Sequence, residues 1–431
     1  MRKTTIYAVL LLSSTSPALA DTFVVDTEVD AMLTGCSGLV VGDCSLRGAI
    51  ERANQTTSTD TISFGFGATT FSLSIGGASE DSNQTGDLDI LQPVHIDGGG
   101  RVTVDASLIA DRVFDVLTDS SSFVTFEGLT ITGGHAPAGD NSFEGGGVRC
   151  IDGAVFLDGA QVTGNGPVRE GAGIFANGCS LVLNRTTIAD NTATLLGGGV
   201  SISSSTMSAP VSAIVGNHAG SFGGGLLAHA FTQVDLDNMT FSGNTAGSEG
   251  SAIDYAGELV LGFVTIVSEP ASGVPAITLN PLPNATLTVS NTLLVGSCDL
   301  GGAFTSGGGN LESPGDTCGF DPLVDQVNVA DARLMPLSVA GSATPYHLPM
   351  AGSPAVDDPL GSITGCPTHD QRFGPPRPLD GNGDGIASCD IGAIERDPLF
   401  QDGFETGDTS RWSSTVLQGL EPLAPSGAPG A

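Results

Sequence analysis

The tetrapeptide GGGV at residues 145–148 returns as GAGI at 171–174, GGGV at 197–200 and GGGL at 223–226. Each copy begins 26 residues after the previous one, and a repeat of this length indicates a solenoid of stacked coils. An asparagine recurs with the glycines near the end of each unit, and the fourth unit is one residue longer: Asn165, Asn191, Asn217 and Asn244. The sequence therefore predicts a chain that winds repeatedly around one axis.

The apolar pattern inside each unit indicates which kind of coil to expect. Val155 and Leu157 are two positions apart, as on one face of a strand, and the other units repeat this spacing. A helical repeat would instead place apolar residues three and four apart over ten or more positions. Glycine and asparagine suit tight corners because both tolerate left-handed backbone. We expect an all-β, right-handed parallel β-helix in which Val162, Ile188 and Ile214 are vertical neighbours and the asparagines hydrogen-bond along their column.

The start of the chain has the pattern of a secretory signal peptide over residues 1–20. Arg2 and Lys3 precede an apolar stretch, and Ala18-Leu19-Ala20 supplies a small-residue cleavage site. Eight cysteines follow, and an even number behind such a signal favours disulfides in an oxidising compartment, although sequence alone does not fix their connectivity. Local pairing would join Cys36/Cys44, Cys150/Cys179, Cys298/Cys318 and Cys366/Cys389.

The charge of the chain limits its partners. Its formal net charge is −33, and Lys3 is the only lysine. Such a chain is repelled by phosphate backbones, which argues against binding to nucleic acid or to anionic membranes. No later stretch contains about 18 consecutive apolar residues, so we expect no transmembrane helix. We expect a monomer whose acidity keeps a repetitive, strand-rich surface soluble.

A cap is predicted at residues 21–60, because a solenoid must cover its first coil. Leu46, Ala49, Ile50 and Ala53 lie three and four apart, as on one face of a short helix. The segment CSLRGAI at residues 44–50 resembles the CSLREA motif that begins many secreted bacterial β-helix proteins, with Gly48 in place of the usual Glu. The glycine-rich repeats are similar to those of polymorphic outer membrane proteins. Winding is expected over residues 61–321.

Residues 345–395 read as a second, small, loop-rich module. The segments Gly352–Asp357 and Cys389–Glu395 resemble the choice-of-anchor Q domain, which closes many β-helix surface proteins. Residues 396–431 read as a short tail that is largely disordered. Together the resemblances imply a protein that is secreted or held at the outer cell surface of a Gram-negative bacterium.

The segment DGNGDG at residues 380–385 matches the first half of a calcium loop. Oxygen ligands at alternate positions suit Ca²⁺, and the glycine at the sixth position allows a sharp turn. The twelfth position is Ile391, so a closing carboxylate would come from Asp390 or Glu395. The candidate ligands are therefore Asp380, Asn382, Asp384, Asp390 and Glu395. An ordinary Asp/Gly turn without metal is the alternative.

Catalytic motifs are weak, and no catalytic or cofactor-binding residue is assigned. A lyase would need a base beside a uronate, but the arginines share no column. A hydrolase would need two carboxylates about 5–10 Å apart. The pairs Asp87/Asp89 and Asp235/Asp237 have strand spacing that would allow this, although such pairs are more often solvent-facing strand residues.

The favoured function is that of a non-catalytic, adhesin-like protein that binds glycans or neighbouring proteins along its coils. The alternative is a polysaccharide lyase or glycoside hydrolase of the parallel β-helix class, for which the fold gives only an analogy. A carboxylate cluster in a groove of the middle coils would favour the enzyme. A smooth groove lined by Ser, Thr and Asn would favour binding.

Overall fold

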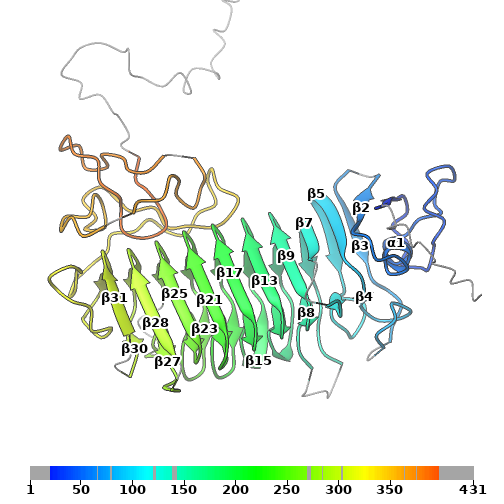
Figure 1. Cartoon of the computed structure of the whole chain (residues 1–431), viewed down its shortest axis with the longest axis horizontal. Coiled ribbons are helices and arrows are strands. Elements are labelled where there is room, and N and C mark those ends of the chain that lie inside the picture. The colour runs from blue at the N-terminus through cyan, green and yellow to red at the C-terminus, as the bar shows by residue number, and fades with distance from the viewer. Residues whose placement is uncertain are drawn as a thin grey trace, which may run out of the picture.

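The computed structural model describes residues 20–397 except 66, 78–79, 120–122, 138–142, 269–272, 284, 302–303, 364 and 375. The expected tail after Asp397, and the expected signal peptide except for Ala20, lie outside the described residues. The described chain is a right-handed parallel β-helix, as the repeats predicted, with the coils stacked along the long axis (Figure 1). Every strand pair in this part of the chain is parallel, and each strand pairs with its equivalent one coil away.

Three faces repeat in every regular coil. The first face consists of β9 (Ala154–Asp158), β13 (Ser180–Asn184), β17 (Thr206–Pro210), β21 (Gln233–Asp237), β25 (Glu258–Gly262), β28 (Thr286–Ser290) and β31 (Phe304–Gly308). The second consists of β10 (Gln161–Thr163), β14 (Thr187–Ala189), β18 (Ala213–Val215), β22 (Thr240–Ser242), β26 (Thr265–Val267), β29 (Leu293–Val295) and β32 (Leu311–Ser313). The third is a separate nine-stranded sheet: β4 (Leu88–Ile90), β6 (Phe114–Val116), β8 (Val148–Ile151), β12 (Ile174–Asn177), β16 (Val200–Ser203), β20 (Leu226–Ala228), β24 (Ile253–Tyr255), β27 (Ile277–Leu279) and β30 (Cys298–Asp299).

A short fourth sheet fills one corner, between the second and third faces. Its members are β11 (Val168–Glu170), β15 (Thr192–Leu196), β19 (His218–Ala219) and β23 (Thr245–Ala246). The remaining strands are near the N-terminus: β1 (Thr22–Val25), β2 (Asp60–Phe64), β3 (Thr69–Ser72), β5 (Val94–Asp105) and β7 (Val124–Thr132). Because β7 pairs with both β9 and β10, the first two faces form one continuous sheet at this end.

Vertical stacking of apolar side chains forms the core. Val162 pairs with Ile188, and Ile188 pairs with Ile214, so the predicted column is confirmed, and all three side chains are fully buried. The corner glycines allow the backbones of neighbouring coils to approach closely. A Cβ atom at Gly173 would lie 2.5 Å from the carbonyl oxygen of Gly199, and one at Gly199 equally close to Gly225 O. Any larger residue would push the coils apart.

The asparagine column forms the predicted ladder. Asn191 Oδ1 accepts hydrogen bonds from the backbone N–H and the side-chain Nδ2 of Asn165, both at 3.0 Å. Asn191 Nδ2 donates in turn to Asn217 Oδ1 at 2.9 Å and to the carbonyl of Val162 at 2.9 Å. Asn217 repeats the pattern with Asn244. The buried amides are therefore satisfied by the next coil.

The N-terminal cap contains the predicted helix, α1 (Leu46–Ala53), which begins after the N-cap Ser45. Leu46, Ala49, Ile50 and Ala53 are buried on its inner side. The glycine at position 48 has a steric reason, since a Cβ there would lie 1.9 Å from Leu33 O. The four cysteine pairs expected from sequence are all disulfides.

The C-terminal module does not extend the coil but folds back along its side (Figure 1). Thr240 Oγ1 donates to Gln371 Oε1 at 2.6 Å, Ala393 N–H donates to Thr265 Oγ1 at 2.9 Å, and the Arg377 guanidinium lies 4.7 Å from the ring centre of Phe263. The module thus covers β22 and β26 on the second face. Within the described residues, no helix has the length and apolar character that crossing a membrane requires.

Candidate functional site

A shallow groove of about 350 Å³ crosses the first face over β13, β17, β21 and β25. Its floor is made by side chains that point away from the core, in two columns that the strand register fixes. One column runs through Ser180, Thr206, Gln233 and Glu258, and the other through Val182, Ser208, Asp235 and Val260. The groove therefore presents one residue of each column per coil.

The lining of this groove is rich in hydroxyl and amide groups. Ser180, Thr206 and Ser208 supply hydroxyls, Gln233 supplies an amide, and Asp235 is an exposed carboxylate. On the two coils before the groove, the aromatic rings of Phe123 and Phe156 lie 6.5 Å apart in an edge-to-face arrangement. The lining also contains Glu258, Val182 and Val260, so it combines the Ser and Thr side chains expected for binding with carboxylates that the enzyme alternative would need.

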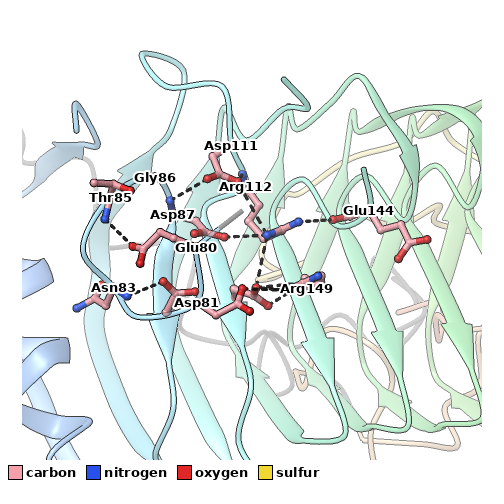
Figure 2. Close-up of polar contacts among 12 residues, drawn as sticks. Glu80, Asp81, Asn83, Thr85, Gly86, Asp87, Asp111, Arg112, Glu144 and Arg149 are labelled. Atoms are coloured by element: carbon pink, nitrogen blue, oxygen red, sulfur yellow. Dashed lines mark hydrogen bonds and ion pairs between the residues drawn. The ribbon is translucent and has the colours of Figure 1, made fainter. Parts of the chain in front are cut away.

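A second feature is a cluster of charges on the third face, over the N-terminal coils (Figure 2). Strand register stacks Asp89 of β4 on Asp115 of β6, and Asp115 on Arg149 of β8. These side chains point away from the core, because the residues between them, such as Leu88 and Ile90, are inside it. The chain from Glu80 to Gly86 contributes further contacts around them, so Asp89 and Asp115 are fully buried.

Two arginines neutralise part of this charge. Arg112 Nη1 lies 3.0 Å from Asp87 Oδ2 and 3.4 Å from Asp115 Oδ2, and its guanidinium lies 4.3 Å from the ring centre of Phe143. Arg149 Nε donates to Asp115 Oδ1 at 2.9 Å, and its Nη2 is also in contact with Asp115 (Figure 2). The Asp115 side chain thus lies between two cations.

The other carboxyls of the cluster have less compensation. Burial raises the pKa of Asp87 to about 8, with Asp111 adding to the shift and Arg112 opposing it. Burial also raises the pKa of Asp89 to about 7, against a 2.6 Å hydrogen bond from the Asn83 N–H. Both side chains are at most 1% exposed, so a polysaccharide could not reach them. The pair that sequence analysis considered for a hydrolase is therefore unsuited to that reaction.

A third polar group links the middle coils on the same face. Glu170 Oε1 accepts hydrogen bonds from His229 Nε2 at 2.8 Å and from Ser201 Oγ at 2.7 Å. Burial alone would raise the pKa of Glu170, but these bonds and Arg169 hold it below its usual value. Because both donors bind the same carboxylate oxygen, His229 is not placed to take a proton from Ser201. The arrangement is not that of an activated serine nucleophile.

The predicted calcium loop forms a turn that its own backbone closes. Asp380 Oδ1 accepts from the N–H groups of Gly383 and Asp384 at 2.7 and 3.1 Å, and Oδ2 accepts from Gly385 N–H at 2.8 Å. Asn382 Oδ1 accepts from Asp384 N–H at 2.8 Å. This geometry accounts for the Asp/Gly pattern. Calcium binding by the turn remains a prediction.

The two closing acids lie in a separate, buried group. Asp390 Oδ1 accepts from the N–H of Asp357 at 2.8 Å, and Glu395 Oε1 accepts from the N–H of Leu379 at 2.7 Å. Glu395 also pairs with Arg377 at 3.4 Å. The structure does not gather the five predicted ligands around one point. Among the described residues, the acidic, histidine or cysteine side chains close enough to share a metal ion are a different group: Asp81, Asp89 and Asp115.

The second carboxylate pair lies at the edge of the groove. Asp235 is exposed on its floor, and Asp237 is half-buried at the end of the same strand, β21. Burial raises the pKa of Asp237, the charge of Asp235 raises it further, and Arg377 opposes the shift. Of the two pairs considered from sequence, this is the one that a bound polymer could reach.

Sequence reasoning missed most of the charged cluster: Asp81, Asp111, Arg112, Asp115 and Arg149. One signal was available, because Asp115 follows Asp89 by 26 residues, which is the period of the regular coils. Applied to the N-terminal coils, that spacing would have placed one carboxyl above the other.

No family model matches the chain, and no curated protein does. Among solved structures, the chain is similar to a crystal structure of the pectate lyase Pel9A. The two share 11% sequence identity, the match covers 88% of this chain and 98% of the other, and the TM-score is 0.43. A likeness at this level says nothing about what the present chain binds or catalyses.

Proposed function

We propose that the protein is a secreted or surface-associated, non-catalytic β-helix protein that binds an extended glycan in the groove over β13, β17, β21 and β25. The observation that carries this proposal is the groove itself, which repeats hydroxyl, amide and carboxyl side chains coil after coil on an open face. Export is supported by the signal-like start of the sequence and by the four disulfides, which persist in oxidising compartments.

The spacing of the groove suits a linear polymer. Hydrogen-bonded strands are about 4.8 Å apart, so each column offers an equivalent contact about every 4.8 Å along the axis. That distance is close to the length of one sugar ring in an extended chain. Each ring would meet a similar pair of side chains, and affinity would grow with the number of coils engaged rather than depend on one deep pocket.

The charges of the groove select among polymers. Gln233, Asp235 and Glu258 offer acceptors to sugar hydroxyls, and the described lining contains no arginine or histidine. A polymer of uronic acids would therefore meet negative charge with no cation to compensate for it. Neutral glycans, or glycans that carry amino groups, are the favoured ligands. The Phe123 and Phe156 rings could stack on a sugar face at one end.

Glycoside hydrolysis in the same groove is the second candidate, and the Asp235/Asp237 pair favours it. Such reactions use two carboxyl groups, one of them an acid with a raised pKa, and the pKa of Asp237 is raised. Asp237 would act as the acid and Asp235 as the nucleophile or base. A lyase has less support, because the groove lining offers no base beyond carboxylates.

The test is a glycan array together with a turnover assay on the chain from Asp21 onward. Ser208→Arg places a large cation on the groove floor and should abolish binding to a glycan that the wild-type protein retains. Ser248→Arg is the matched control, since Ser248 is exposed on a turn outside the groove lining. Equal binding by both variants would refute the groove as the site.

Turnover separates the two candidates. The binding proposal expects no new reducing ends from any bound glycan after prolonged incubation. Release of reducing ends by the wild-type protein, lost in both Asp235→Asn and Asp237→Asn, would instead establish the hydrolase. Retained binding in these variants would show that the loss was not caused by misfolding.

A further inference from the structure

Three acidic side chains on the N-terminal coils meet at a point that the groove does not include. Asp89 and Asp115 come from neighbouring coils, and Asp81, which Figure 2 labels, comes from the segment before β4. One carboxylate oxygen from each of the three lies within 4.8 Å of the other two. The Asp81 side chain is 64% exposed, whereas those of Asp89 and Asp115 are fully buried. The point is therefore open to solvent on one side only.

Buried oxygens at this place have no hydrogen-bond donor. Asp89 Oδ1 is buried and without a partner, as is Asp87 Oδ1 two residues earlier, and both side chains are at most 1% exposed. Asn83 Oδ1 is also without a partner, but the Asn83 side chain donates to the carbonyl of Arg47, on the side of α1. Asn83 and Asp89 are in direct contact through the backbone N–H of Asn83. Unpaired buried acceptors are rare in folded proteins. Asp89 Oδ1 therefore lacks a hydrogen-bond donor or a cation, whereas Arg112 Nε, which is also unpaired in this cluster, lacks an acceptor.

The arginines do not fill this need. The acidic side chains around the point are Asp89 and Asp115 together with Glu80, Asp81, Asp87 and Asp111. Against them stand Arg112, which contacts Asp87 and Asp115 and lies 3.9 Å from Asp111, and Arg149, which contacts Asp115 and lies 3.8 Å from Asp81. Among the described residues, no ion pair involves Asp89. The negative charge of the cluster exceeds what its cations balance.

We propose that Asp81, Asp89 and Asp115 bind a divalent cation of the calcium class. Calcium takes oxygen ligands at about 2.3–2.6 Å, so two oxygens on opposite sides of the ion are about 4.8 Å apart, which is the span of the three carboxylates. Water would complete the shell on the side of Asp81. The ion would tie the Glu80–Gly86 segment to β4 and β6 and so fasten the chain over the irregular coils. This site is independent of the proposed glycan groove.

Calcium chloride titrated into the chelated chain from Asp21 onward tests the proposal, with isothermal calorimetry and the melting temperature as readouts. Asp81→Asn is the first variant, because Asp81 is exposed and its loss should leave the fold intact. Asp89→Asn is the second, because the amide keeps the size of the buried side chain. Asp384→Asn is the control, since it removes a carboxylate from the C-terminal turn that the sequence suggested as a calcium loop.

We expect the wild-type protein to bind calcium and to show a higher melting temperature with it. The affinity for calcium should fall about tenfold or more in Asp81→Asn and Asp89→Asn, and it should change little in Asp384→Asn. Circular dichroism of each variant confirms that it is folded. Absence of calcium binding in the wild-type protein would overturn the site. Binding that survives both N-terminal substitutions but is lost in Asp384→Asn would overturn it equally, and would assign the ion to the C-terminal turn.

Discussion

The regular coils and the N-terminal coils bury polar groups in opposite ways. In the regular coils, Asn165, Asn191 and Asn217 pass hydrogen bonds from each coil to the next. In the N-terminal coils, Asp87 and Asp89 are as deeply buried, but each has an oxygen without a donor. The same architecture thus contains a satisfied ladder and an unsatisfied cluster.

The difference teaches what repetition does for a solenoid. An amide has both donors and an acceptor, so a column of identical amides satisfies itself whenever the register is kept. A carboxylate has only acceptors, so stacking Asp89 on Asp115 creates a need for cations from elsewhere. Arg112 and Arg149 meet part of that need.

The largest effect is expected when the ladder is interrupted. Asn191→Ala removes the acceptor of Asn165 N–H and Nδ2, and it removes the side-chain donor to Asn217 Oδ1 and to the carbonyl of Val162. The loss of these four buried hydrogen bonds together should lower the free energy of unfolding by about 4 kcal/mol. Urea denaturation measures it. Asn184→Ala is the control, because Asn184 donates only to Asp158 at a half-exposed position, and a similar loss there would contradict the special role of the ladder.

A slightly smaller effect is expected from removing a cation in the N-terminal cluster. Arg112→Met removes the ion pair of Asp87 and one of the two ion pairs of Asp115 in a buried place, which should cost about 3 kcal/mol. The same change in the regular coils provides the comparison, since Arg185 binds Asp158 with two nitrogens but is half-exposed. Arg185→Met should cost less than about 1 kcal/mol. Equal losses in denaturant unfolding would remove the contrast between the regions.

The regular coils also contain one buried carboxyl group with an unpaired oxygen. Asp254 on β24 is buried with one oxygen unpaired, and burial, together with Glu249, raises its pKa to about 6. The folded state then holds the proton more tightly than the unfolded state, so stability falls as the pH rises from about 4 to about 6.

Asp254→Asn removes this proton. The difference in stability between variant and wild type should therefore shift by about 2 kcal/mol in favour of the variant between pH 4 and pH 7. Parallel unfolding curves, recorded in the presence of a chelator at both pH values, measure the shift. A difference that does not change with pH would show that Asp254 is already ionised in the folded protein at pH 4.

The smallest effect on stability is expected on the floor of the groove. Thr206 is exposed, and its hydroxyl makes only a long 3.5 Å contact with Ser180. Thr206→Ala should change the free energy of unfolding by less than about 0.5 kcal/mol. Glycan affinity, measured on the same sample, should nevertheless fall. Loss of stability without loss of affinity would mean that the groove is structural.

The regular coils could be predicted from the sequence because one repeat length determined which residues stack on one another. A period of 26 residues placed Val162, Ile188 and Ile214 in one column, and the asparagine column followed from the same register. The N-terminal coils lack that period in their glycines. There β5 is a single long strand whose pairing with β7 shifts register between Asp97 and Val102.

The candidate sites were harder to predict from the sequence, because they depend on contacts between distant segments. Asp89 was recognised as one of a pair, but its burial depends on the segment around Asn83, which no periodicity describes. The groove lining could be inferred from strand alternation once the register was known, because Thr206 and Gln233 occupy equivalent positions. The five predicted calcium ligands came from a local motif, and a local motif says nothing about which distant acids will fold beside it.

The placement of the disulfides has a mechanical consequence. Cys150–Cys179 joins two coils before the groove and Cys298–Cys318 lies beyond it, so no covalent cross-link spans the coils between Cys179 and Cys298. Tension along the axis would be borne there by strand pairing alone. The module that docks on Thr240 and Thr265 clamps this uncross-linked stretch from the side. We expect the module to support these coils from outside. In a protein pulled from its two ends, the coils between Cys179 and Cys298 should unfold first, once the contacts of the module with Thr240 and Thr265 break.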